Sequence, residues 1–424
     1  MTAAVLDELA GGAQLAHIEG RRAPARFARS IASVADLEHV GARLHASDGV
    51  SQLWLTPRFS RARSIAGLER AWTPARFGGA APAAIVAPGL NRRLRALDSI
   101  SGDALLATLE LLRATLGVGI DGTPGQTAEM LLRGLLARRG EFKPLQSPEA
   151  LPSVSEAVLN WIRPLDADEQ ACEWLLAIDR RAAYLQSMSL LDVGLGDPQC
   201  VARPTWRELL WTPGYYHAHL RPWRENYMPE PLGQGAGVGG DNQTLRWLTA
   251  PSLRLAAQLG RVLDVDEAWT WQRKSRALAP LARRIFRARA TFAAAAPSLV
   301  PYGDPLLKRA YTELVGRFRM EAHRGTPLYR PDWYSHVVGD ARSRVWVGAY
   351  AFRTISGRAP AACNLDCWYV LADEPSLPAP FCESKWWRLE AAVPVSDVGL
   401  DVFDGRSVAE LSKRVRRAKA GGRA

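Results

Sequence analysis

The chain has 424 residues, 47% of them hydrophobic, which is enough for one large domain or two to three smaller ones, each with its own core. No run approaches the roughly 18 uncharged apolar residues of a membrane-spanning helix, and the first residues, MTAAVLDELAGG, lack the basic stretch of a secretory signal. Five cysteines in so long a chain argue against a disulfide framework. We therefore expect a cytoplasmic protein with reduced thiols and no membrane partner.

The net charge of +11 is concentrated in two places. Seven basic residues and no acidic residue lie between Gln272 and Val300, and six basic residues with no acidic residue lie between Lys413 and Arg423. A solvated helix face is the simpler explanation of either run. Two runs without acidic partners favour contact with phosphate groups.

The first part of the chain, residues 1–80, reads as mixed helix and strand. Residues 94–117 have apolar residues at helical spacing, and Thr123-Pro124-Gly125-Gln126 resembles a capping box that opens a helix to about residue 138. A loop at 144–152 is a candidate boundary. The apolar run WLLAI then predicts a buried strand that stops at Asp179, with a helix over 182–191 after it.

The middle of the chain contains GYYHAHLR, which alternates like a strand, and a glycine-rich turn at 233–240. A helix is expected from Thr249, a strand over 262–271, and helices over 277–296, 304–320 and 335–352. The last of these has a possible apolar stripe: Val337, Val338, Val345, Val347, Tyr350 and Ala351. A strand–turn–strand pattern around Leu365-Asp366 and a basic C-terminal helix follow. This order predicts an α+β or mixed α/β protein.

Two carboxylates are unusual because of where they occur. Asp179 ends an apolar strand, and Asp366 lies at the tip of an apolar hairpin, where a charge must be paired or bind a metal if it is buried. In the simpler interpretation, Asp179 caps the next helix and Asp366 serves the turn. If the strand and the hairpin are neighbours in one sheet, the two carboxylates can meet, and a cation between them would offset their repulsion.

Three segments, taken in order, resemble a known family. The first is Asp179-Arg-Arg-Ala-Ala-Tyr184, the second is Lys308-Arg-Ala-Tyr-Thr312-Glu-Leu-Val-Gly316, and the third is Asn364-Leu-Asp366-Cys367. They are similar to motifs A, B and C of family B DNA polymerases. The segment Lys385-Trp386-Trp387 resembles the lysine-containing segment that follows motif C in the protein-primed branch. The resemblance covers residues 170–395.

The resemblance implies a fold and a domain order. Residues 151–395 would form the palm, an antiparallel sheet with helices, and helical fingers at about 272–320. Residues 1–150 would be an N-terminal region of mixed α/β type whose role stays open. Residues 396–424 would be a short basic tail or a reduced thumb.

The resemblance also implies roles for single residues. Asp179 and Asp366 would hold two Mg²⁺ ions, or Mn²⁺, for nucleotidyl transfer. Tyr184 would lie under the incoming sugar, and Lys308 would hold the triphosphate. The other nucleotide-binding candidates are Arg283, Arg284, Arg287 and Thr312. The DNA-binding candidates are Lys385, Trp387 and Gly316.

The departures from the family pattern leave two functions open. Asn364 replaces the first motif C aspartate, and Thr312 and Val315 replace the asparagine and tyrosine of motif B. No early Asp-x-Glu marks a proofreading exonuclease, since His17-Ile-Glu19 is a poor match. The first hypothesis is an exonuclease-deficient polymerase of a plasmid, phage or linear mobile element that uses primer-template DNA and dNTPs, with a terminal or other replication protein as a further partner.

The second hypothesis is a catalytically inactive polymerase-fold protein that binds DNA in replication or at DNA ends. The third is an unrelated basic DNA-binding regulator.

Three smaller signals have alternative explanations. Cys363, Cys367 and Cys382 could be read as a zinc site, although their spacing is not that of a standard one. His217 and His219 share a strand face that is more simply explained by solvation than by a metal. The Trp386-Trp387 pair is the best candidate for stacking on a base.

Overall fold

The structure, a computed structural model, describes residues 43–47, 50–54, 84–86, 100, 102–118, 123–137, 143–145, 151, 152, 154, 156, 159–233, 244–404 and 407–421. His17-Ile-Glu19 and almost all of the predicted glycine-rich turn lie outside these residues. The chain divides into two compact units. The N-terminal unit comprises Met1–Arg139 and Pro280–Arg317, and the C-terminal unit comprises Gly140–Ala279 and Phe318–Ala424.

The N-terminal unit combines a small sheet with helices. Its strands are β1 (Arg43–Ser47), β2 (Val50–Trp54) and β3 (Ala84–Val86), with β1 antiparallel and β3 parallel to β2. Its helices are α7 (Gly102–Leu116), α8 (Pro124–Ala137), α12 (Ala279–Ala295, whose first residue belongs to the other unit) and α13 (Val300–Arg317). Helix α13 packs along α8, and Arg317 pairs with Glu129 at 2.9 Å between them.

The start of α8 confirms the predicted capping box. The Gln126 backbone N–H donates to Thr123 Oγ1 at 3.3 Å, and the Thr123 N–H donates to the Gln126 side-chain oxygen at 2.8 Å. Two amide groups that have no partner within the helix are thereby satisfied, which is why this boundary could be read from the sequence.

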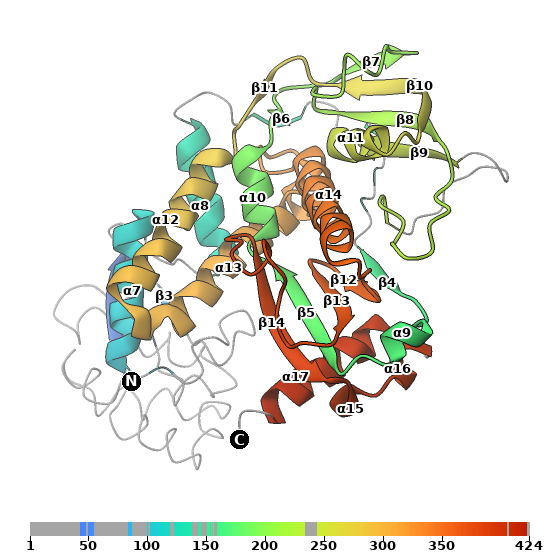
Figure 1. Cartoon of the computed structure of the whole chain (residues 1–424). Helices are drawn as coiled ribbons and strands as arrows, with labels where there is room; N and C mark the ends of the chain where they lie inside the picture. The colour runs from blue at the N-terminus through green and yellow to red at the C-terminus, as the bar shows by residue number, and fades with distance from the viewer. Residues whose placement is uncertain are drawn as a thin grey trace, which may run out of the picture. The chain divides into compact units, whose positions relative to one another are not determined.

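A five-stranded antiparallel sheet is the centre of the C-terminal unit (Figure 1). Its order is β14 (Trp387–Pro394), β5 (Trp174–Arg180), β13 (Cys367–Ala372), β12 (Ala362–Asn364) and β4 (Asn160–Ile162). In β5 all residues after Trp174 are buried, so both faces of the strand are covered. The continuous apolar run WLLAI reflects this two-sided burial.

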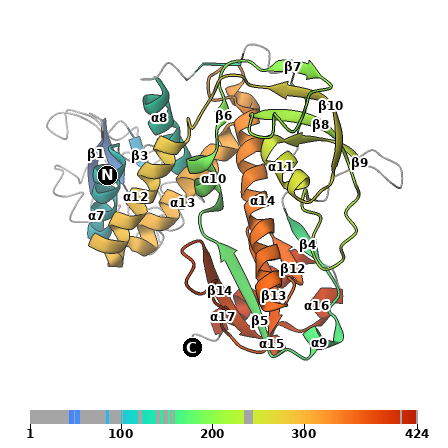
Figure 2. The same ribbon diagram turned by 45° about the horizontal axis from the view of Figure 1, so that its top comes forward.

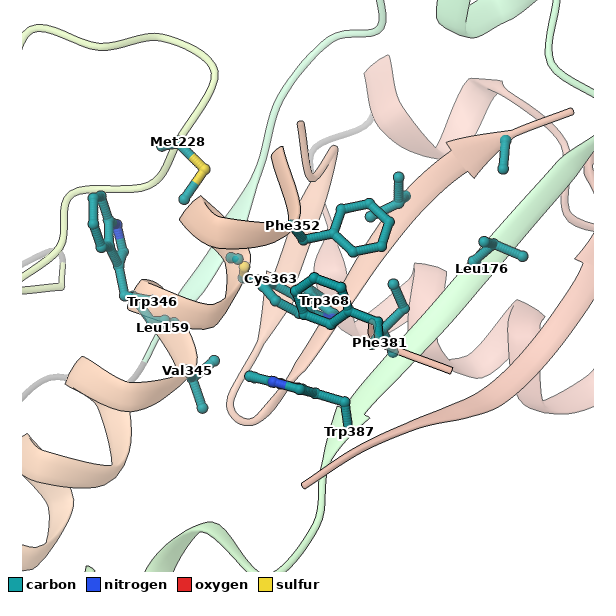
Figure 3. Close-up of a cluster of buried hydrophobic side chains, with 14 of the residues drawn as sticks. Leu159, Leu176, Met228, Val345, Trp346, Phe352, Cys363, Trp368, Phe381 and Trp387 are labelled. Carbon is teal, nitrogen blue, oxygen red and sulfur yellow. The ribbon is translucent and has the colours of Figure 1, made fainter. Parts of the chain in front are cut away.

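One face of this sheet packs against α14 (Pro331–Ser356), through a cluster that includes Leu176, Phe352, Trp368 and Trp387. Figure 3 shows the Trp368 and Trp387 rings one above the other, with centroids 4.5 Å apart. The other face packs against the C-terminal helices. These are α15 (Val395–Val398), α16 (Asp401–Asp404) and α17 (Val408–Gly421).

A second antiparallel sheet lies within the same unit (Figure 2). Its order is β7 (Gln199–Ala202), β10 (Val262–Thr270), β8 (Gly214–Leu220) and β9 (Thr244–Thr249). Helix α11 (Ala250–Gln258) covers one face of it and packs against α14. The remaining short elements are α9 (Ala167–Gln170), α10 (Ala183–Leu190) and the β6–β11 pair (Val193–Gly194 with Lys274–Ser275).

The predicted stripe on α14 is only partly correct. Val337, Val338 and Val345 are buried, whereas Val347 and Tyr350 are exposed. The helix is also longer than expected, because Pro331 starts it and Gly357, at φ 73°, ends it. The predicted α+β class is confirmed. Among the described helices, none combines the length and apolarity that crossing a bilayer requires.

Candidate active site

Asp179 and Asp366 come from neighbouring strands. Asp179 on β5 is in register with Cys367, the first residue of β13, and the Arg180 N–H donates to the Asp366 carbonyl at 3.0 Å. Asp366 is therefore the turn residue one step beyond the end of the ladder. The condition set from the sequence, that the strand and the hairpin be neighbours in one sheet, is met.

The chain makes unusual backbone turns next to both aspartates. Ala182, between Asp179 and Tyr184, has φ 52°, and Leu365, directly before Asp366, has φ 59°. Left-handed backbone at a residue other than glycine costs about 1–3 kcal/mol and is found most often where a functional geometry requires it. Both turns change the direction of the backbone close to the candidate residues.

Asp179 is 5% exposed, and its carboxylate is paired with a cation from the other neighbouring strand. Arg388 on β14 is in register with Asp179 and donates from Nε to Oδ2 at 2.9 Å. Residues that face each other in register share a sheet face, so Asp179, Cys367 and Arg388 all stand on the α17 side. Burial, and then the nearby Asp179 carboxylate, raise the pKa of the Cys367 thiol.

Tyr184 lies near the same place. It is half-buried near the start of α10. Burial raises the pKa of its phenol, and Tyr334 and then the Asp366 carboxylate add to this effect. The Asp366 carboxylate is therefore close enough to Tyr184 to act on it electrostatically.

Comparisons with known proteins find similarity only to solved structures. No protein-family model and no curated protein matches the chain. Among solved structures, the chain is similar to phi29 DNA polymerase in a ternary complex with primer-template DNA and incoming nucleotide substrates, with a TM-score of 0.48, 13% identity, and coverage of 69% of this chain and 55% of that chain. It is also similar to phi29 DNA polymerase complexed with primer-template DNA, with a TM-score of 0.46, 12% identity, and coverage of 72% and 58%. The chain spans just over half the length of these polymerase chains, and the case for a function rests on its own side chains.

Asn364, which stands where motif C has its first aspartate, has a structural partner. Its Nδ2 donates to Ser412 Oγ on α17 at 2.8 Å, and that hydroxyl also lies 2.9 Å from the Tyr369 hydroxyl. An amide can donate this hydrogen bond and an ionised carboxylate cannot. Asn364 therefore helps to attach α17 to this face of the sheet.

The segment after motif C divides between surface and core. Lys385 is exposed, and its ammonium lies 4.9 Å from the centre of the Trp386 ring, which is 37% exposed. Trp387 is 7% exposed and stacks on Trp368 in the core (Figure 3). This burial corrects the sequence-based assignment of Trp387 to DNA contact, because the alternating pattern of β14 turns this ring inward. Trp386 is the member of the pair that a base can reach.

The remaining candidate residues from the sequence lie on helices of the N-terminal unit. Lys308, Arg283 and Arg287 are exposed on α13 and α12. Arg284 instead donates to the Leu116 carbonyl at 3.0 Å, so it holds the end of α7. Thr312 bonds back to the Lys308 carbonyl at 3.0 Å within α13. Val315 is buried, and Gly316 is half-buried close to the end of α13.

The structure does not support the two alternative metal sites. Cys363 pairs with Trp368 on the α14 face, whereas the next ladder pair places Cys367 on the α17 face, so these thiols diverge. His217 and His219 both point at Asp266, at 3.9 and 2.8 Å, on a half-exposed strand face. Within the described part of the chain, no three residues of the His, Cys, Asp and Glu types gather as a metal site.

A metal ion at these two aspartates would have to need few protein ligands. Magnesium is such an ion, because it keeps waters and takes phosphate oxygens of a substrate as its remaining ligands. Asp179 and Asp366 would hold it. The guanidinium of Arg388 competes for Oδ2 of Asp179, so the ion and the arginine would share or exchange this carboxylate.

Sequence reasoning missed two residues of this site, Arg388 and Ser412. The signal for Arg388 was present in WRLEAAVP, whose alternating apolar residues Trp387, Leu389, Ala391 and Val393 are typical of a strand. A strand after motif C would have placed an arginine beside the sheet. The sequence held no comparable signal for Ser412, since its role depends on how α17 docks.

Proposed function

We propose that this protein is a template-directed, DNA-polymerase-like nucleotidyltransferase without a proofreading exonuclease, which acts on primer-template DNA and dNTPs. The observation that carries the proposal is the hydrogen-bonded neighbourhood of Asp179 and Asp366 at one end of an antiparallel sheet. Replication of a plasmid, a phage or a linear mobile element is the role we assign to it, with a terminal or other replication protein as a further partner.

The residues of the chain divide the work of nucleotidyl transfer. Asp179 and Asp366 would bind Mg²⁺ or Mn²⁺, which when bound lowers the pKa of the attacking hydroxyl and offsets charge on the leaving pyrophosphate. Tyr184, half-buried beside Asp366, would contact the sugar of the incoming nucleotide. Lys308, with Arg283 and Arg287, is proposed to bind its triphosphate. Lys385 and Trp386, both exposed, would contact the primer strand.

A second function is favoured by specific contacts. Arg388 pairs with Asp179 and offsets its charge, and Asn364 contributes an amide where a carboxylate would add a ligand. A protein with these features could have kept the fold and DNA binding and lost the chemistry. This alternative is a catalytically inactive DNA-binding protein that acts in replication or at DNA ends.

Primer extension with Mg²⁺ or Mn²⁺ separates the two functions. If the enzyme proposal holds, Asp366→Ala should lower the extension rate by about 10³-fold, the size of several kcal/mol of lost charge stabilisation. Asp373→Ala is the matched control, because Asp373 follows β13 at the far end of the same strand and pairs with Arg358. It should extend primers like the wild type.

Binding of the same primer-template DNA completes the test. Wild-type extension no faster than that of Asp366→Ala, with tight DNA binding by both, would show that the protein is the inactive DNA-binding form. Absence of both extension and DNA binding would leave the third hypothesis, a regulator that recognises other DNA.

A further inference from the structure

A cavity of about 400 Å³ lies in the C-terminal unit between α11 and α14, away from the Asp179 face of the sheet. Arg180 of β5 forms part of its wall, with Trp211, Arg254, Asp340 and Arg344. Consecutive strand residues point to opposite faces, so Asp179 faces α17 while Arg180 faces α14. The cavity is thus separate from the candidate active site.

The cavity has an excess of positive charge. Among the described residues that line it, four are charged: Arg180, Arg254 and Arg344 against Asp340 alone. Arg344 donates to Asp340 at 2.6 Å, so the carboxylate is already engaged. Burial, and then the Arg344 charge, lower the pKa of Arg180 to about 10, and burial also lowers that of Arg254. Each cation is therefore less stabilised here than in water.

Arg180 is a buried cation whose hydrogen bonds are only partly satisfied. The residue is 8% exposed, its guanidinium lies 4.7 Å from the centre of the Trp387 ring, and Nη2 donates to the Gln186 side chain at 2.6 Å. Its Nε is buried and has no hydrogen-bond partner among the described residues. A buried donor without a partner costs about 1–3 kcal/mol, so Arg180 is held in the cavity wall at a cost in stability.

The rim of the cavity offers a flat aromatic surface. Trp211 is 70% exposed, and the guanidinium of Arg254 lies 4.7 Å from the centre of its ring. An exposed indole beside arginines is the combination that holds a base by stacking and its phosphate by charge. The volume also suits one nucleotide, since small-molecule sites range from roughly 300 to 1,000 Å³.

We propose that this cavity binds a phosphoryl group, carried by a free nucleotide or by a nucleic-acid strand, with Arg180, Arg254 and Arg344 as its ligands. Trp211 stacks on the attached base. The site lies outside the proposed catalytic centre and does not depend on the proposed function. Loss of Asp366 therefore leaves phosphate binding unchanged.

Calorimetric titration of the full chain with inorganic phosphate, a nucleoside monophosphate and an oligonucleotide with a 5′-hydroxyl tests this site. Arg344→Gln should weaken binding about tenfold or more, the size expected for one lost charge-assisted hydrogen bond. Arg353→Gln is the matched control. Arg353 lies on the same helix, pairs with Glu225 and does not line the cavity. It should bind like the wild type.

A variant that binds phosphate more tightly shows that changes in binding do not simply reflect loss of folding. Asp340→Asn removes the competing carboxylate, so phosphate should bind more tightly and raise the melting temperature more than it does for the wild type. Binding of the mononucleotide but not of the oligonucleotide identifies a free nucleotide as the ligand, and binding of both identifies a strand. Equal losses in Arg344→Gln and Arg353→Gln, or no binding of any probe to the wild type, would overturn the proposal.

Discussion

Arg388 donates a hydrogen bond from Nε to Oδ2 of Asp179 at 2.9 Å, and its Nη2 lies 2.8 Å from the same oxygen as an ion pair. The two residues face each other in register across β14 and β5. Asp179 is almost fully buried while Arg388 remains partly exposed, so the arginine can leave the pair more easily than the aspartate can. The site thus has its own cation, which a metal ion would displace or join.

Replacement of Arg388 by alanine should make stability depend on divalent ions. Removing one partner leaves a buried carboxylate uncompensated, and for this partly exposed pair we expect a loss of about 1–3 kcal/mol of unfolding free energy. Mg²⁺ or Mn²⁺ should restore more of the melting temperature in Arg388→Ala than it adds to the wild type. Circular dichroism melts with and without the ion measure this difference.

Arg353→Ala is the control for that experiment. It removes an arginine from a pair with Glu225 in which both side chains are at least partly exposed, which should cost about 0–1 kcal/mol and leave the response to the ion as in the wild type. If the ion stabilises Arg388→Ala and Arg353→Ala equally, Arg388 does not compete with a metal ion for Asp179.

Asn364→Asp should place a second carboxylate beside Asp366 and alter one contact of α17. The aspartate can only accept from the Ser412 hydroxyl, so the hydrogen bond between sheet and helix must reverse, at a cost of at most about 1 kcal/mol. A third acid near Asp179 and Asp366 should bind Mn²⁺ more tightly, by severalfold, as seen by electron paramagnetic resonance titration. Asn364→Ala removes the side-chain hydrogen bond to Ser412 without adding charge. Equal Mn²⁺ affinity in these two variants would show that position 364 does not face the ion.

Much of the candidate site could be predicted from local signals. The run WLLAI, the turn at Leu365 and the helix after Asp179 each follow from a pattern within about ten residues, and the structure has all three. The pairing of β5 with β13 was a conditional expectation that the ladder confirms. These features depend on periodicity and turn chemistry, which a sequence displays directly.

What could not be predicted depends on contacts between distant segments. The burial of Trp387 follows from its place opposite Arg180 and against Trp368, and the arginine pair of Asp179 comes from a residue 209 positions away. The exposure of Val347 and Tyr350 reflects which side of α14 meets the sheet. A one-dimensional pattern shows that a face is apolar and does not show which neighbour covers it.

Replacement by alanine should have opposite effects on stability at two helical glycines, Gly348 and Gly316. A Cβ at Gly348 on α14 would lie 2.0 Å from the Trp387 ring, so Gly348→Ala should cost about 1–3 kcal/mol of unfolding free energy as helix and ring separate. At Gly316 on α13 no described heavy atom lies within 4 Å of the added Cβ. There alanine should stabilise the chain by about 0.5–1 kcal/mol. Urea unfolding of both variants compares them.

The second variant of this pair also tests the motif B resemblance. If the Gly316 backbone contacts DNA closely, Gly316→Ala should weaken primer-template binding while it stabilises the fold. Unchanged affinity in a stabilised variant would remove Gly316 from the DNA-binding residues.

His336 is a buried base that should make the C-terminal unit sensitive to acid. The Gly214 N–H donates to its Nε2 at 3.1 Å, so Nδ1 must carry the proton that is donated to the Asp332 carbonyl at 2.7 Å. The neutral imidazole therefore makes both hydrogen bonds, and protonation of Nε2 would break the one from Gly214. Burial lowers its pKa, against opposing effects from Asp332 and Glu156, and the Arg254 charge lowers it further.

The sign of the pH dependence follows from this lowered pKa. Below about pH 6.5 the unfolded chain protonates this histidine while the folded chain does not, so stability falls as the pH falls, by up to about 1.4 kcal/mol per pH unit. His336→Gln removes the titrating group. Its cost in unfolding free energy should be largest near about pH 7.5 and should shrink toward about pH 5. Denaturant titrations of both proteins at these two pH values measure the change, and a cost independent of pH would mean that folding does not shift the pKa of His336.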